Sequence, residues 1–258
     1  MSAGMDAVLA IGLCVLYAAA GVVIVRKLMQ GKVREGHNDT IAPMFATAGV
    51  IYAVLLGFLV VVVWESFDAA KANMQDEATT LTTLYRLTAG MRHPEERAEM
   101  RAAIRKYTND VIDDEWKSLA TTGNPSTLTR QSMGRIYTAF SHMPLSESGS
   151  MVNGAFLRAL SRIIVDRNRR VVQAGEALPL VLWIGLAVGG AIVVGMTFLL
   201  YMEAIWPHVV MSGVLAALIG TLLFVTIVLD RPFAGPMALD SSAFEYTINL
   251  YDSVDRGS

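Results

Sequence analysis

Four apolar stretches, each long enough to cross a bilayer, constrain this chain more than any other feature. They cover roughly residues 7–25, 41–63, 179–202 and 208–229, and a spanning α-helix needs about 20 apolar residues. Only 17% of the 258 residues are charged, against about a quarter in soluble domains. The sequence therefore predicts a multi-pass membrane protein with helical spans, because a helix satisfies its own backbone polar groups within lipid.

The long interval between the second and third stretches predicts a separate helical domain. Apolar residues recur there at helical spacing after Pro94 and again before Pro144, and no alternating β pattern competes. Within this interval, Asn124 or Ser126 is expected to cap a helix. We expect an all-α fold with four spans and a helical domain between spans 2 and 3. The predicted segments are a first transmembrane hairpin at 1–64, the helical domain at 65–178, a second transmembrane hairpin at 179–229 and a C-terminal tail at 230–258.

The distribution of basic residues predicts the orientation in the membrane, since Lys and Arg near span ends favour the cytoplasmic side. The loop of the first hairpin holds four of them: Arg26, Lys27, Lys32 and Arg34. The opposite side holds seven: Lys71, Arg158, Arg162, Arg167, Arg169, Arg170 and Arg231. This excess predicts that both termini and the helical domain are cytoplasmic. The arginines before the third span are interpreted as orientation signals and lipid-headgroup contacts.

The second apolar stretch carries one line of side chains that ends in a carboxylate. An α-helix advances about 100° per residue. On such a helix several side chains fall within about 40° of one direction, namely Thr47, Ile51, Val54, Phe58, Val61 and Glu65. Asp68 lies roughly 60° from this line. We call the six aligned residues the α-helical stripe.

The stripe has three interpretations. Its acidic end can simply be the hydrated end of a lipid-facing helix. A carboxylate at the hydrocarbon boundary also usually faces water or protein, so copies of the helix around an axis would form an apolar constriction, at Thr47 to Val61, with an acidic mouth at Glu65 and Asp68. A third possibility is a non-conducting membrane scaffold, in which the stripe would be buried against the fourth span.

Several sequence segments resemble the bacterial family of bestrophin-like domain proteins. They are "HNDTIAPMFATAGVIYAVLLGF" at 37–58, "DEW" at 114–116 and "LDRPF" at 229–233. The triplet Leu56, Gly57 and Phe58 is similar to the start of the pore helix in bestrophins, and "DRPFAGPMALDSSAFE" resembles the Pro-Phe-Gly segment that follows their fourth span. This resemblance implies a homo-pentamer with its second helix around a central pore, with the constriction at Phe58, Val54 and Val50.

The chain departs from bestrophins in two respects that bear on function. Bestrophin necks are rich in Phe, whose electropositive ring edges suit anions, whereas this stripe has only Phe58. The bestrophin calcium clasp is a dense acidic run, whereas the matching segment here offers only Asp240 and Glu245, and a calcium site needs about six to eight oxygens. With Glu65 and Asp68 uncompensated on the stripe, we expect a cation channel, with potassium as the ion; the bestrophin resemblance alone implies chloride.

The remaining polar residues predict no catalytic centre. The four histidines are scattered, and neither a phosphate loop nor a nucleophile motif occurs, so we expect no enzyme activity, no cofactor and no metal. His37 and Asp39 could line the outer mouth of a pore, although a plain polar loop is the simpler interpretation. Asp76 and Glu77 could extend the acidic mouth, although a solvated helix face is the simpler interpretation. The turn Asp113–Glu115 is interpreted as a solvated or inter-subunit acidic turn. The net charge of −2 is too small to imply a nucleic-acid partner, so we expect no nucleic acid. Monovalent ions, membrane lipid and further copies of the chain are the expected partners. The predicted location is the bacterial inner membrane.

Overall fold

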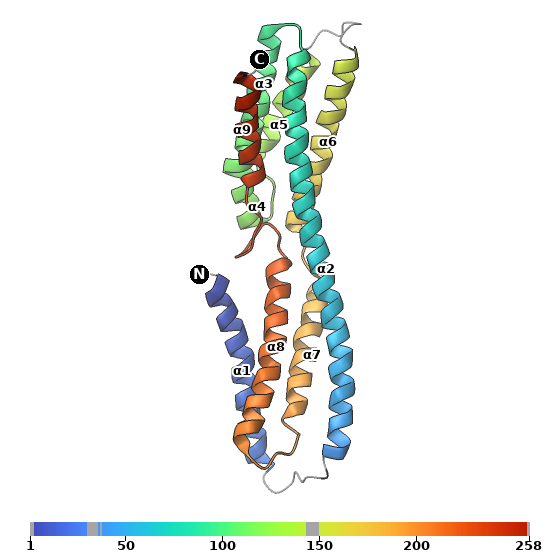
Figure 1. The fold of residues 1–258 in the computed structure, drawn as a ribbon, viewed down its shortest axis with the longest axis vertical. Helices are drawn as coiled ribbons and strands as arrows, with labels where there is room; N and C mark the ends of the chain where they lie inside the picture. The colour runs from blue at the N-terminus through green and yellow to red at the C-terminus, as the bar shows by residue number, and fades with distance from the viewer. Residues whose placement is uncertain (1–2, 30–35, 37, 143–149, 257–258) are drawn as a thin grey trace. The chain divides into compact units, whose positions relative to one another are not determined.

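The chain is built from helices throughout the residues that the computed structural model describes, which are 3–29, 36, 38–142 and 150–256. The two long N-terminal helices are α1 (Ala3–Leu28) and α2 (Asn38–Leu87). Shorter helices follow: η2 (Thr88–Gly90), α3 (Pro94–Asp110), the π-helical turn η3 (Val111–Glu115), α4 (Trp116–Thr122) and α5 (Thr127–Ser141). The remaining helices are α6 (Ser150–Gly175), α7 (Leu180–Thr197), α8 (Ile205–Leu229) and α9 (Ser242–Arg256) (Figure 1). The predicted all-α fold class is confirmed.

Four of these helices are long and apolar enough to cross a membrane: α1, α2, α7 and α8. The predicted third span, to residue 202, is too long, because α7 ends at Thr197. The backbone N–H groups of Phe198, Leu199 and Leu200 each bond to the carbonyl three residues earlier. Such i to i−3 bonds tighten the chain into turns and end the α-helix.

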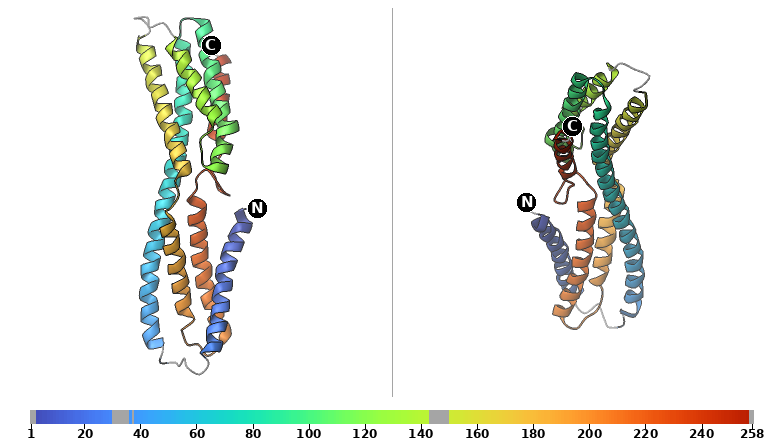
Figure 2. Two further views of the ribbon diagram at one scale, coloured as in Figure 1. Left: turned by 180° about the vertical axis from the view of Figure 1, so that it is seen from behind. Right: turned by 45° about the horizontal axis from the view of Figure 1, so that its top comes forward.

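The chain divides into two compact units, and the first holds the four apolar helices (residues 1–65 and 177–230). In this unit α1 lies beside α8, and the first part of α2 packs on α7 (Figures 1 and 2). The buried face of α2 consists of Tyr52, Leu56, Leu59 and Val63, which repeat at helical spacing. Tyr52 donates a hydrogen bond to the carbonyl of Leu186 (3.2 Å).

Two glycines of α7 allow this close packing. A Cβ atom at Gly189 would lie 2.8 Å from the Tyr52 ring, and one at Gly190 would lie 2.8 Å from the Tyr52 hydroxyl. Any larger residue would therefore push α2 away from α7. Small residues at helix contacts are the usual means by which membrane helices approach closely.

The second unit consists of residues 66–176 and 231–258. The second part of α2 supplies Leu81 and Leu84 to its core, which α3, α5, α6 and α9 complete with side chains that include Ile104, Ile136 and Leu160. Ser126 caps α5 by accepting hydrogen bonds from the backbone of Leu128 and Thr129, which settles the choice of cap between Asn124 and Ser126. The unit is thus a helical bundle with its own hydrophobic core.

The C-terminal helix α9 is held in this unit by stacked rings and ion pairs. The rings of Tyr85 and Tyr251 stack with centroids 4.0 Å apart. Asp255 accepts hydrogen bonds from the Tyr85 hydroxyl (2.7 Å) and from Arg105 (2.7 Å) and pairs with Arg101 (2.8 Å). Burial raises the pKa of Asp255, but the bonds from Tyr85 and Arg105 together outweigh burial and hold its pKa below the usual value.

Candidate functional site

The α-helical stripe lies on a side of α2 that the described residues leave exposed. Ile51, Val54 and Phe58 are 67%, 68% and 66% exposed, and Thr47 and Val61 are exposed as well. The buried face described above points roughly 120–180° away from the stripe, at about 100° per residue. Among the described residues the stripe is therefore uncovered, and it is not buried against α8.

The start of α2 is held by hydrogen bonds from Asn38 and Thr47. Asn38 bonds to the backbone of Tyr201 in both directions, accepting from its N–H (2.7 Å) and donating to its carbonyl (3.0 Å). Thr47 donates its hydroxyl proton to the carbonyl of Pro43 (2.9 Å). The Thr47 oxygen thus presents lone pairs, and no proton, to whatever faces the stripe. Asp39 is exposed in the first turn, and His37 lies outside the described residues.

The acidic end of the stripe carries charge that the described part of the chain does not neutralise. Glu65 and Asp68 are exposed, and neither forms an ion pair with a described residue. Their carboxylates are therefore available to mobile ions. A pair of such groups on one helix face attracts cations and repels anions.

The exposed side of α2 continues beyond Glu65 with small and polar residues. The next positions in line with the stripe, at 3.6 residues per turn, are Ala69, Ala72, Asp76, Thr79 and Thr83, all exposed or nearly so. Asp76 forms an ion pair with Arg162 of α6 (3.1 Å). Large apolar side chains thus give way to small and hydrophilic ones along one unbroken helix face.

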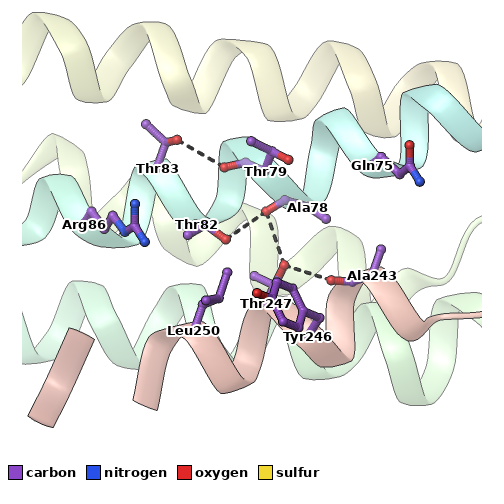
Figure 3. A pocket seen from close by; sticks show the side chains of 10 residues that line it. All are labelled: Gln75, Ala78, Thr79, Thr82, Thr83, Arg86, Ala243, Tyr246, Thr247 and Leu250. Atoms are coloured by element: carbon purple, nitrogen blue, oxygen red, sulfur yellow. Dashed lines mark hydrogen bonds between the residues drawn. The ribbon is translucent and has the colours of Figure 1, made fainter. Parts of the chain in front are cut away.

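A groove of about 530 Å³ runs beside the second part of α2, with α9 as its other wall (Figure 3). Three of its hydroxyl groups donate within the helices: Thr83 donates to Thr79, Thr82 donates to Ala78, and Thr247 donates to Ala243. The groove therefore offers hydroxyl lone pairs, and Arg86 provides the only charge among its lining residues.

The acidic residues after α8 do not converge on a common site. Asp240 accepts a hydrogen bond from the N–H of Ser242, and the hydroxyl and backbone bonds of Ser242 lower the pKa of Asp240. Glu245 accepts a bond from Ser241 (2.8 Å). Both carboxylates serve the first turn of α9, where negative charge stabilises a helix. Among the described residues, no cluster of His, Cys, Asp or Glu could hold a metal ion.

Two predictions about surface charge are wrong. Glu77 and Glu115 were expected in solvent, yet both are fully buried. Arg167 and Arg170 were expected at the lipid surface, yet they pair with these glutamates inside the second unit. Because a buried charge is stable only beside a partner, each error accounts for the other. The pairing joins residues 52 and 93 positions apart, and no local sequence pattern reveals it.

Comparison with known proteins supports the same fold. The family model described as Bestrophin-like domain matches residues 12–244. A crystal structure of a bacterial bestrophin homologue from Klebsiella pneumoniae superposes with a TM-score of 0.76 at 16% identity, over 96% of this chain and 98% of that one. A variant of the same homologue gives a TM-score of 0.76 at 13% identity, over 97% and 99% of the two chains. No curated protein matches significantly.

Proposed function

The chain belongs to the bestrophin-like domain family, and from that premise we propose that it forms a ring of identical subunits, each contributing its α2 stripe to a central ion pathway. The ring is a homo-pentamer in this proposal. It sits in the bacterial inner membrane, with both termini and the helical unit in the cytoplasm. Lipid surrounds the outer helices, and monovalent ions pass along the axis.

The observation that carries this proposal is the exposure of the stripe on the side of α2 that faces away from the chain's own core. Lipid could cover Ile51, Val54 and Phe58, but it cannot stabilise the carboxylate of Glu65 on the same line. A water-filled axis suits both, because apolar constrictions and charged rings are standard parts of ion pores. Phe58 and Val54 form the constriction in this proposal, and Glu65 and Asp68 form the acidic mouth.

The ion that this pathway passes is a cation, with potassium as the expected cytoplasmic species. Glu65 and Asp68 lack basic partners among the described residues, so they concentrate cations at the mouth. The Thr47 oxygen also favours a cation, because its proton is donated to the carbonyl of Pro43 and its lone pairs remain available to a positive ion. Lys71, the nearest base in sequence to Glu65, lies about 120° around the helix from it.

Two measurements test the proposal together. Light scattering of the protein in mild detergent should give the mass of a closed oligomer, and a stable monomer would rule out a pore of this kind. The reconstituted protein should then pass potassium in a vesicle flux assay. A closed oligomer that passes no ion, with its stripe unreactive toward water-soluble reagents, would favour the membrane scaffold.

A further inference from the structure

A fully buried arginine occupies the centre of the second unit. Arg170 of α6 donates through Nε to Glu77 Oε2 (2.8 Å) and through Nη2 to Glu77 Oε1 (3.1 Å). Its Nη1 lies 3.6 Å from Glu115 Oε1, while the other Glu115 oxygen accepts from Arg167 (3.0 Å). We call Glu77, Glu115, Arg167 and Arg170 the buried charge cluster. A guanidinium that binds a carboxylate through two parallel hydrogen bonds adds geometric specificity to the pair, so the bonds of Arg170 to Glu77 restrict the position and orientation of both side chains.

Aromatic rings extend this cluster to the segment that follows α8. The guanidinium carbon of Arg170 lies 5.4 Å from the ring centroid of Trp116 and 5.5 Å from that of Phe244, within cation–π range. The Trp116 indole N–H donates to the carbonyl of Leu239 (2.9 Å), and its ring meets Phe233 edge-on at 5.6 Å. Phe233 and Leu239 belong to the stretch between α8 and α9.

Within the second unit, Arg170 thus contacts side chains from different segments of the chain. Glu77 belongs to α2 and Phe244 belongs to α9. Trp116 begins α4 and in turn contacts Leu239 and Phe233, which follow α8.

The charge of Arg170 persists under all physiological conditions. Burial lowers its pKa, but the charge of Glu77 and its hydrogen bonds outweigh burial and raise the pKa above the usual value. Tyr107 donates to Glu77 Oε1 (2.8 Å), so this carboxylate has partners on both sides. A buried charge without its partner is strongly unfavourable. The orientation of Glu77, and of the helix that carries it, is consequently restricted.

We propose that Arg170 is a positioning residue for the ion pathway, fixing the rotation of α2 about its own axis through Glu77 and coupling that rotation to the segment after α8 through Trp116. This role rests on the proposed function, in which the stripe faces the axis. Because α2 is one helix from Asn38 to Leu87, a rotation at Glu77 carries along it to Phe58. A turn of about 100° replaces each stripe residue with its neighbour in sequence.

A matched pair of substitutions tests the proposal. Glu77→Gln and Glu115→Gln each remove one charge from a fully buried side chain that bonds to an arginine of α6, but only Glu77 belongs to α2. A single cysteine at Val61, in a Cys14→Ser background, reports the stripe through its rate of modification by a water-soluble thiol reagent. We expect Glu77→Gln to change this rate and the unitary conductance at least fivefold, with Glu115→Gln within twofold of the parent.

A conservative substitution of Arg170 distinguishes a positioning role from a role in folding. Arg170→Lys keeps the charge but not the fork, so it should shift the labelling rate in the same direction as Glu77→Gln while the oligomer remains intact by light scattering. If either glutamine variant fails to assemble, Trp116→Phe replaces the pair. It keeps an aromatic ring beside Arg170 but removes the N–H that bonds to Leu239 together with one of the two fused rings of the indole, and it should change the rate severalfold.

The outcomes that overturn the proposal differ from those that overturn the pore. If the cysteine at Val61 reacts at the same rate in Glu77→Gln and in Glu115→Gln, Arg170 has no positioning role, but the ion pathway stands. The same conclusion follows if the rate in Trp116→Phe equals that in the parent. A cysteine that is unreactive in the parent oligomer refutes the water-filled stripe, and the role of Arg170 with it.

Discussion

Replacing Glu65 with Gln should reduce the preference for cations by an amount that can be calculated. For a carboxylate about 7 Å from the axis, the Coulomb energy on a monovalent ion is about 0.6 kcal/mol in water. Salt near 0.1 M, with a Debye length of about 10 Å, reduces this by roughly half. Five subunits then contribute about 1.5 kcal/mol, which is close to a tenfold change in local cation concentration. The substitution keeps the size of the side chain and removes only its charge.

The measurement is the reversal potential under asymmetric potassium chloride. The parent should reverse near the potassium equilibrium potential, and Glu65→Gln should move the value toward zero. At 1 M salt, where the Debye length is about 3 Å, parent and variant should nearly coincide. Asp113→Asn, which removes an exposed carboxylate from η3 and not from α2, is the control and should leave the potential unchanged. Reversal at the chloride equilibrium potential, unmoved by Glu65→Gln, would refute the reasoning and assign the protein to anion channels.

Three further predictions concern other parts of the structure. Phe58→Ala should raise ion flux, because a smaller side chain lets water enter the constriction more easily. Its control on the buried face, Leu56→Ala, should instead lower the free energy of unfolding by about 2–5 kcal/mol. Gly189→Ala should cost about 1–3 kcal/mol in a thermal unfolding assay, because its Cβ would lie 2.8 Å from a tyrosine ring, while Gly185→Ala has open space and should be neutral. The attachment of α9 through Asp255 should be complete above the ordinary Asp pKa of about 3.9 and weaken only as the pH falls through its lower folded value, as measured by hydrogen exchange of α9.

Each of these has an outcome that would count against it. Equal flux in Phe58→Ala and the parent would remove Phe58 from the constriction. Equal unfolding temperatures for Gly189→Ala and Gly185→Ala would mean that α2 is not packed against α7. Protection of α9 that declines between pH 8 and 5 would point to a group other than Asp255, since the depressed pKa of Asp255 keeps it charged throughout that interval.

The helical period of α2 could be predicted from the sequence because the residues on each of its faces recur at regular spacing. Apolar residues fill the first part of the helix on every side, so the carboxylate of Glu65 was the signal that distinguished one direction from the others. The structure adds that Tyr52 and Leu56 occupy the opposite face, against α7. The sequence did not predict which face of α2 packs against α7. That packing depends on Gly189 and Gly190, and their importance is evident only from the structure, in which Tyr52 approaches them.

The interior of the second unit could not be predicted in the same way. Glu77 and Arg170 lie 93 residues apart, and each has the composition of a surface residue when its helix is considered alone. Their burial depends on tertiary packing that brings α2, α6 and α9 around Trp116. The π-helical turn at Val111–Glu115 also left no sequence signal, because the apolar spacing from Met100 to Leu119 suits an uninterrupted α-helix.

That turn has a consequence for how chains of this kind can change over time. A π-helical turn holds one residue more than the α-helical turn it replaces, so it behaves as a single inserted residue that the surrounding helix has absorbed. Deleting one residue between Val111 and Glu115 would therefore leave a plain α-helical turn with the residues on either side in nearly the same register. An extra or missing residue elsewhere in the helix, with no wide turn to absorb it, would instead rotate Trp116 by about 100° and move its indole N–H away from the Leu239 carbonyl. The position of this turn thus marks where the helix tolerates a change in length.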